Sequence, residues 1–222
     1  MKPKRLNHEA KLIVFDWDGT LMDSVAHIVN CLQTAITALD LEPKTPDELK
    51  NIIGLGLREA LLSLYPQATD NALLELTAQY REHFFDQESD SCELFSGARG
   101  LIEELAARDY FLAVATGKGR NGLDKVLSET GMADYFPFTR CADESHSKPN
   151  PQMLLDVIDY YGVEAGETIM VGDTEYDLQM ANNAAAMSIG VTYGVHEKNR
   201  LLECKPLTCL DNIQELHKWL LN

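Results

Sequence analysis

The sequence is poor in positive charge. It contains 19 Lys and Arg residues against 35 Asp and Glu residues, which gives a formal net charge of −16 at pH 7. A nucleic-acid-binding protein normally carries a basic patch or stripe, and this sequence shows none. An acidic surface also argues against binding to anionic membranes. A small anionic substrate is still possible, because salt screens exposed charges beyond about 8 Å and the pocket decides what binds.

Long hydrophobic runs are also missing. The N-terminal stretch MKPKRLNHEAKLIVFDWD contains one short apolar run, too short for the core of a signal peptide or for a membrane span. The five cysteines form no CxxC pair, and no HExxH motif occurs among the six histidines. We therefore expect a cytoplasmic protein with free thiols and no zinc-type site. The sequence does not indicate an oligomeric state.

Apolar runs of strand length recur along the chain and alternate with helical patterns in its second half. Continuous apolar strands that alternate with helices indicate a parallel sheet buried on both faces. We therefore predict an α/β fold with a Rossmann-like, doubly wound parallel sheet. The runs are Leu12–Phe15, Tyr110–Ala115, Thr168–Val171 and Met187–Val191, with weaker ones at Phe138–Cys141 and Leu207–Leu210.

One interval interrupts this alternation. Between Asp16 and Tyr110 there is no convincing strand, and the pattern instead predicts several helices. We interpret residues 24–91 as a small, all-helical domain inserted after the first strand, with 1–23 and 92–222 forming the core. The polar stretch DQESDSCE suits the returning linker. Such an insertion lies over the carboxyl end of the first strand, where ligands bind in open parallel sheets.

Four aspartates follow strands at this edge. Asp16 and Asp18 end the run LIVFDWD, and Asp173 and Asp177 lie in the stretch TIMVGDTEYD. Carboxylates repel one another and resist burial, so their convergence needs a counter-charge. Mg²⁺ prefers hard oxygen ligands. Asp16 and Asp173 can supply carboxylate oxygens, and Asp18 a backbone carbonyl, which predicts a magnesium site.

Hydrogen-bond donors are expected at the same edge. Thr116 and Gly117 end the run FLAVATG, and Lys148 lies in the stretch SKPNP. Together with the backbone N–H groups of Trp17 and Gly117, these donors suit phosphate oxygens. A cation and donors that face a carboxylate indicate phosphoryl transfer to Asp16, a nucleophile that is already ionised at pH 7. Asp18 could protonate the leaving oxygen and then deprotonate the attacking water.

The stretches DWDGT, ATG, SKPNP and GDTEYD resemble, in order and spacing, the four motifs of the haloacid dehalogenase superfamily. The resemblance covers nearly the whole chain, and the helical insertion resembles the family's small cap domain. It implies a Mg²⁺-dependent phosphatase that acts through an aspartyl phosphate. The implied roles are Asp16 as nucleophile, Asp18 as acid/base, Thr116 and Lys148 as phosphate ligands, Asp173 as a magnesium ligand, and Asp177 as a second acid that binds the metal directly or through water.

The subgroup that the chain most resembles is that of the phosphoglycolate phosphatases and their sugar-phosphatase relatives, for which GVTYG is typical. 2-Phosphoglycolate is therefore the best single substrate prediction. Two positions depart from the pattern: Ala186 stands where relatives often carry glycine, and Gly117 where Asn is common. In the insertion, Arg58 follows two glycines and is a weak candidate for contact with an anionic leaving group.

Other interpretations stay open at this stage. A sugar phosphatase, a pyrophosphatase or a phosphomutase would share the motifs, and a catalytically silent interaction module is a further alternative. A phosphonatase would need a Schiff-base lysine, but Lys44 and Lys50 lie in no obvious substrate loop. A dehalogenase would not need Asp18. The stretch GKGRNG fits a dinucleotide fingerprint, although not on a first strand. Asp23 is expected to cap the first inserted helix.

Overall fold

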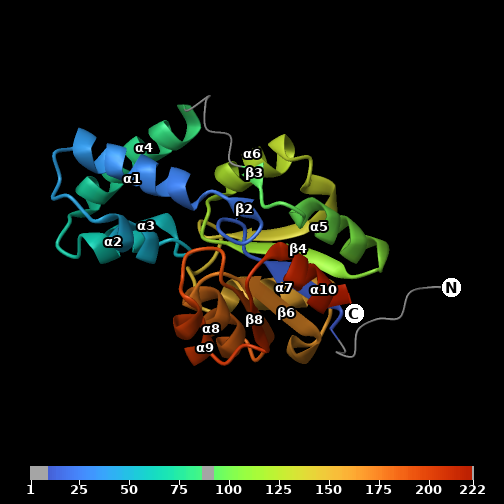
Figure 1. The fold of residues 1–222 in the computed structure, drawn as a ribbon. Coiled ribbons are helices and arrows are strands. Elements are labelled where there is room, and N and C mark those ends of the chain that lie inside the picture. The colour runs from blue at the N-terminus through green and yellow to red at the C-terminus, as the bar shows by residue number, and fades with distance from the viewer. Residues whose placement is uncertain (1–9, 87–92, 222) are drawn as a thin grey trace.

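The computed structural model describes residues 10–86 and 93–221, and its centre is a six-stranded sheet (Figure 1). The strand order is β5-β4-β1-β6-β7-β8, and all pairings are parallel. This arrangement confirms the predicted α/β class and the doubly wound parallel sheet. The strands are β1 (Leu12–Phe15), β4 (Phe111–Thr116), β5 (Phe138–Cys141), β6 (Thr168–Gly172), β7 (Met187–Val191) and β8 (Thr208–Leu210).

Helices cover both faces of the sheet because its central strands are apolar on both sides. In β1, Ile13 and Phe15 pack into one hydrophobic cluster, whereas Leu12 and Val14 pack into another. Alternate residues of a strand point to opposite faces, so a continuous apolar run needs a cover on each. One cover contains α5 (Ala98–Ala107), α6 (Arg120–Glu129) and α10 (Ile213–Leu221), and the other contains α7 (Gln152–Tyr161) and α8 (Glu175–Asn183). The short helix α9 (Lys198–Glu203) packs beside β7 and β8.

Four further helices, here called the cap helices, lie together beside the sheet (Figure 1). Their apolar stripes, such as Ile28, Leu32 and Ile36 in α1, form a hydrophobic core of their own. The predicted end of the insertion and most of its returning linker fall on residues 87–92, outside the described residues. The cap helices are α1 (Val25–Ala38), α2 (Pro46–Asn51), α3 (Leu57–Leu64) and α4 (Asp70–Asp86).

The two connections to the cap helices form a small antiparallel ribbon that the sequence did not predict. It pairs β2 (Met22–Asp23) with β3 (Glu93–Leu94). Strands this short are too brief to show an alternating pattern. The prediction that Asp23 caps α1 is wrong, because Asp23 is an exposed residue of β2 and Ser24 precedes the helix. The Ser24 hydroxyl donates to Asp18 (2.7 Å), so its role is to position that carboxylate.

The cysteines of the described ranges are free thiols, as predicted. Cys31, Cys141 and Cys204 are buried, and Cys209 is half-buried. Cys92 lies outside the described residues. Within the described ranges, no helix combines the length and the apolar character that a bilayer crossing requires.

Candidate active site

The predicted site residues meet at the carboxyl edge of the sheet. Asp16 directly follows β1, Thr116 ends β4 and Asp173 directly follows β6, while Lys148 lies in the loop between β5 and α7. Asp177 lies in the first turn of α8. All five residues are at most 1% exposed. The structure therefore brings together, in a buried position, groups that are up to 161 residues apart in the chain, since 177 − 16 = 161.

Three of these carboxylates form a cluster around one lysine. Oxygen atoms of Asp16, Asp173 and Asp177 all lie within 4.8 Å of one another. Lys148 Nζ lies 2.9 Å from Asp16 Oδ1 and 2.6 Å from Asp177 Oδ1. One ammonium group facing three carboxylates leaves an excess of negative charge when all of them are ionised. The excess negative charge of the cluster therefore favours the binding of a cation.

The pKa values reflect this imbalance. Burial raises the pKa of Asp16 to about 7, against the opposing effect of Lys148. Burial, followed by repulsion from Asp16 and Asp177, raises the pKa of Asp173 well above its ordinary value. Burial by itself would lower the pKa of Lys148, but the two carboxylates outweigh it and raise that pKa. Without a further positive charge, the site thus favours protonated carboxyl groups.

The donor set fits a hard divalent cation. Carboxylate oxygens are the preferred protein ligands of Mg²⁺, and a bound cation would favour the ionised acids. Asp173 is held in place by the Thr20 hydroxyl (2.8 Å) and by the backbone N–H of Val195 (2.9 Å). Asp177 accepts the Thr174 backbone N–H (3.1 Å) in the capping box of α8, so it serves both as a helix cap and as a member of the cluster.

Asp18 lies outside this cluster, at the junction with the cap helices. One of its oxygens accepts the Ser24 hydroxyl, and the other lies 3.0 Å from Lys118 Nζ. Lys118 Nζ is also 4.4 Å from the ring centroid of Phe84 in α4, a cation–π distance. A residue of the core thus connects Asp18 to a cap helix, which sequence reasoning did not foresee.

The expected phosphate donors differ in their availability. The Thr116 hydroxyl oxygen accepts the backbone N–H of Lys118 (3.2 Å), which leaves its own O–H free to donate. The backbone N–H of Trp17 donates to Asp16 Oδ1 (2.7 Å). Gly117 lies against the loop between α2 and α3, and a Cβ there would be 2.4 Å from the carbonyl oxygen of Leu55. This contact explains why the chain has no side chain where Asn is common.

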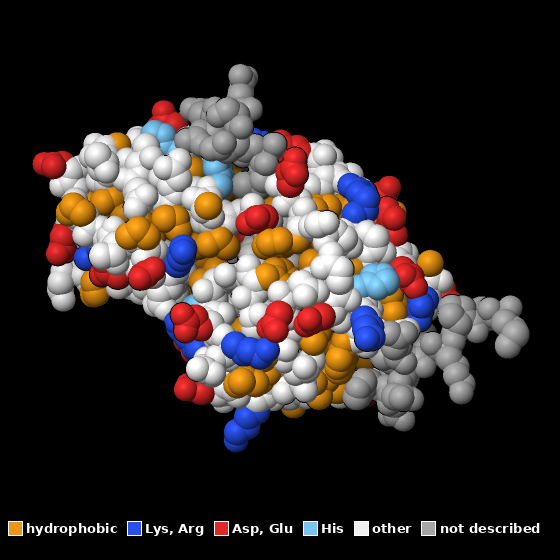
Figure 2. Space-filling view, viewed as in Figure 1, with side chains coloured by type: hydrophobic (Ala, Val, Ile, Leu, Met, Phe, Trp, Pro, Cys, Tyr) orange, Lys and Arg blue, Asp and Glu red, His pale blue; other side chains and the backbone are white. Residues whose placement is uncertain are grey.

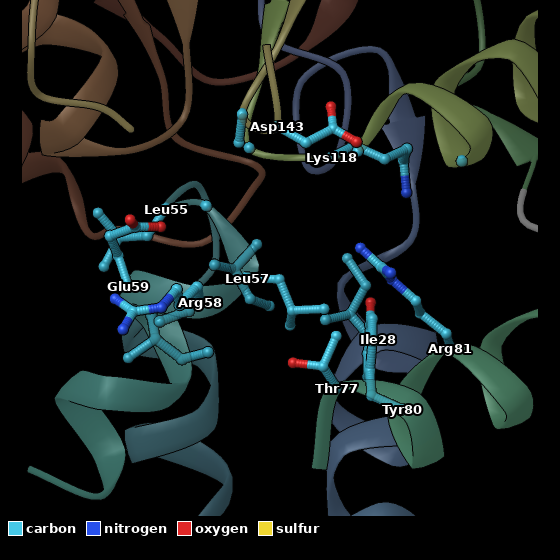
Figure 3. Close-up of a pocket in the computed structure, with 18 of the residues that line it drawn as sticks. Ile28, Leu55, Leu57, Arg58, Glu59, Thr77, Tyr80, Arg81, Lys118 and Asp143 are labelled. Carbon is cyan, nitrogen blue, oxygen red and sulfur yellow. The ribbon is translucent and has the colours of Figure 1, made fainter. Parts of the chain in front are cut away.

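A cavity of about 710 Å³ separates the sheet edge from the cap helices. On the core side it is lined by Asp16, Asp18, Thr116 and Gly117. In Figure 3, Lys118 and Asp143 face this space from the core, and Leu57, Thr77 and Tyr80 face it from the cap helices. Figure 2 shows hydrophobic side chains gathered along this junction. The nucleophile predicted from the sequence is therefore open to a ligand in the cavity.

Arg58 also lines the cavity, but its position is peripheral. Its side chain is 62% exposed, and its guanidinium lies 2.8 Å from Asp70 in α4. Arg81, in α4, lines the cavity as well and points into the space beside Ile28 (Figure 3). Unlike Arg58, Arg81 has no carboxylate partner within the described part of the chain. Sequence reasoning did not single out Arg81, since it sits in an ordinary helical pattern.

The motif GVTYG supplies residues that hold the site together. Tyr193 donates its hydroxyl to the backbone oxygen of Thr20 (2.9 Å), and Val195, the residue that follows the motif, donates its N–H to Asp173. A Cβ at Gly194 would lie 2.3 Å from an oxygen of Asp173, so only glycine fits there. The motif was noticed in the sequence, but its contact with the first motif depends on the fold.

Comparison with known proteins agrees with this geometry. Residues 13–191 match the family model described as haloacid dehalogenase-like hydrolase. A Dickeya dadantii protein named "Probable phosphatase IndB" is 33% identical over 92% of this chain and 91% of its own. A phosphoglycolate phosphatase of Vibrio vulnificus is 31% identical over 94% and 95%. Among solved structures, a "predicted phosphoglycolate phosphatase" from Haemophilus somnus has a TM-score of 0.84 at 22% identity, covering 96% of this chain and 99% of its own.

Proposed function

Since the chain belongs to the haloacid dehalogenase-like hydrolases and is a phosphatase, we propose that it hydrolyses a small phosphorylated metabolite through an aspartyl phosphate on Asp16, with Mg²⁺ as cofactor. One observation supports this most directly. The buried carboxylate of Asp16 lines the cavity on one side and belongs to the cluster with Asp173, Asp177 and Lys148 on the other. The proposed nucleophile, the proposed cation site and the cavity thus share one side chain.

The residues suggest a reaction in two steps. The Asp16 carboxylate attacks phosphorus, the bond from phosphorus to the leaving oxygen breaks, and Asp18 gives that oxygen its proton. Asp18 then takes a proton from a water molecule that attacks the phosphorus of the aspartyl phosphate. This second step releases inorganic phosphate and restores Asp16. Thr116, Gly117 and Lys148 donate hydrogen bonds to the phosphoryl oxygens and orient them for attack.

Asp16, Asp173 and the backbone carbonyl of Asp18 would hold Mg²⁺, with Asp177 as a ligand or as a partner of a bound water. When bound, the ion offsets the repulsion between the phosphoryl group and the carboxylates. Lys148 then stays protonated and can donate hydrogen bonds, because the carboxylates of Asp16 and Asp177 stabilise its positive charge.

2-Phosphoglycolate is the first ester to test, because several curated relatives that share about 30% of their residues with this chain are named phosphoglycolate phosphatases. A sugar phosphatase, a pyrophosphatase or a phosphomutase would use the same core residues. A silent interaction module would have no need of a buried acid cluster, which costs folding free energy.

The test is phosphate release from a panel of esters with Mg²⁺, with excess chelator and with Ca²⁺. We expect release with Mg²⁺ alone, because Ca²⁺ takes more ligands in a looser geometry. Full activity in chelator would overturn the cofactor proposal.

Asp18→Asn separates the two steps: phosphorylation of Asp16 should slow less with a nitrophenyl ester, whose leaving group needs little protonation, than with an alkyl ester. Equal losses with both esters would show that Asp18 is not the general acid.

A further inference from the structure

The two sides of the cavity differ sharply in chemistry. The core side carries the acids and donors of the phosphoryl site, whereas the cap side is mainly apolar. A cavity of about 710 Å³ lies within the range of pockets that hold whole organic ligands. The apolar and aromatic residues that the cap helices contribute to it include Ile28, Leu32, Leu57, Leu73, Tyr80 and Phe84.

Two aromatic rings give this apolar wall a defined surface. The rings of Tyr80 and Phe84, one turn apart on α4, have centroids 5.7 Å apart and a tilt of 35°. Leu57, from α3, faces the same space as Tyr80 (Figure 3). Aromatic and aliphatic walls of this kind bind flat apolar groups well, because each ring covers a large area without a polar group left unpaired.

Of the three cations that line the cavity, two already have acid partners, and Arg81 alone has none within the described part of the chain. Lys118 is engaged with Asp18 at 3.0 Å, and Arg58 is engaged with Asp70 at 2.8 Å. Glycolate, one of the smallest possible leaving groups, would leave the half-buried members of the wall, Leu57 and Tyr80, in contact with water. Apolar surface that stays wet contributes nothing to binding.

We propose that the preferred leaving group carries a planar, mainly apolar ring that packs against Leu57, Leu73 and Tyr80 while its phosphoryl group meets Asp16. The inference rests on the proposed phosphatase function and narrows its substrate class. Hydrolysis breaks the bond between phosphorus and the ester oxygen, and it yields inorganic phosphate and a ring-bearing alcohol. The first motif and Lys148 act on the phosphoryl group of any such ester, whereas the apolar wall of the cap helices selects esters that carry a ring.

The test compares ethyl phosphate with 2-phenylethyl phosphate. Both release primary alcohols of similar acidity, so the chemical step is matched and the ring is the variable. Burial of one phenyl ring should raise kcat/KM about 30- to 100-fold. 2-Phosphoglycolate is measured beside them. A kcat/KM for 2-phosphoglycolate or ethyl phosphate that equals or exceeds that of the phenyl ester overturns the inference and leaves the phosphatase proposal intact.

Two variants of α4 locate the effect. Thr77→Phe fills the cavity from the cap side and should reduce the advantage of the phenyl ester over ethyl phosphate to about threefold or less. Ala78→Phe adds the same ring at the next, exposed position, which does not line the cavity, and should leave the ratio unchanged. Equal ratios in the two variants would count against the assigned wall.

A binding measurement separates the two proposals. Benzylphosphonate and methylphosphonate cannot be hydrolysed at this bond, and their affinities can be compared by calorimetry with the wild-type protein. We expect benzylphosphonate to bind at least about tenfold more tightly. Tight binding without turnover of any ester would refute the phosphatase function and support the ring site. Turnover together with equal binding of the two phosphonates would refute the ring site.

Discussion

Replacement of Asp16 by Asn should make the metal-free protein more stable while it abolishes turnover. Two unit charges within 4.8 Å of each other repel by at least about 3.5 kcal/mol at an effective dielectric constant of about 20. Asp16 has two such neighbours, Asp173 and Asp177, and one attraction, to Lys148 at 2.9 Å, of about 6 kcal/mol on the same scale. Repulsion and attraction nearly cancel, so the cost of burying the ionised Asp16 is left uncompensated.

The pKa of Asp16 sets the size and the pH range of the effect. A rise from 3.8 to about 7 is equivalent to a cost of up to about 4 kcal/mol for the ionised group. Below pH 3.8 the carboxyl is protonated in both the folded and the unfolded state. Between there and pH 7 the folded state binds more protons, so stability falls as the pH rises, and above pH 7 the loss is complete. The difference between variant and wild type should therefore grow across this range.

We expect Asp16→Asn to recover about half of this cost, because Lys148 loses one of its carboxylate partners. A gain of about 2 kcal/mol at pH 8 raises Tm by about 4–8 °C in a chain of this size. Thermal unfolding in chelator at several pH values measures it, with the exposed Asp23→Asn as the matched control. A variant that is less stable at pH 8, or a difference that does not change with pH, would refute the reasoning. Activity within about tenfold of wild type would refute the role of nucleophile.

Three further changes test other parts of the structure. Gly117→Ala should displace the loop between α2 and α3, because the carbonyl oxygen of Leu55 lies 2.4 Å from the added carbon, and it should raise KM by about tenfold. An unchanged KM would show that this loop moves aside without a cost to substrate binding. Ala185→Gly should raise Tm by about 2–4 °C, because Ala185 is left-handed (φ 57°) after α8, and Gly162→Ala should have the opposite effect at the equivalent place after α7; unfolding curves that do not move would contradict this. With 2-phosphoglycolate, Arg81→Met should lower kcat/KM more than Arg58→Met, because Arg58 already has an acid partner; kinetics that show equal losses would refute this ranking.

The sheet and its catalytic edge could be predicted because one physical rule governs both. Strands buried on two faces appear in the sequence as continuous apolar runs, and the predicted bounds of β1, β5 and β7 agree with the structure. In a parallel sheet the carboxyl ends of neighbouring strands meet at one edge. The residues after β1 and β6 therefore had to converge, whatever lay between them in the chain. That convergence predicts the position of Asp16 and Asp173 from the sequence alone.

Contacts that depend on a backbone conformation or on short pairings were beyond the sequence. Resemblance placed the unusual residue at Ala186, whereas the left-handed conformation lies at Ala185. The N–H of Ala186 bonds to the carbonyl of Ala181, and that of Ala185 to the carbonyl of Asn182. This pair of hydrogen bonds ends α8 and fixes which residue is left-handed. An apolar pattern cannot distinguish two neighbouring alanines, so the hydrogen bonds decide the position.

The apolar wall of the cavity was the feature least predictable from the sequence. Leu73, Leu76, Tyr80 and Phe84 form one helical stripe in the sequence, and such a stripe predicts only that α4 packs against something. In the structure, Leu73 and Leu76 are both buried in the core of the cap helices, but Leu73 also lines the cavity, as do the half-buried Tyr80 and Phe84. Which members of a stripe touch other helices, and which are left for a ligand, is decided by where α1 and α3 cross α4. Catalytic chemistry can therefore be predicted from local motifs. The choice of leaving group depends on how the cap helices pack, so it has to be measured on the folded protein.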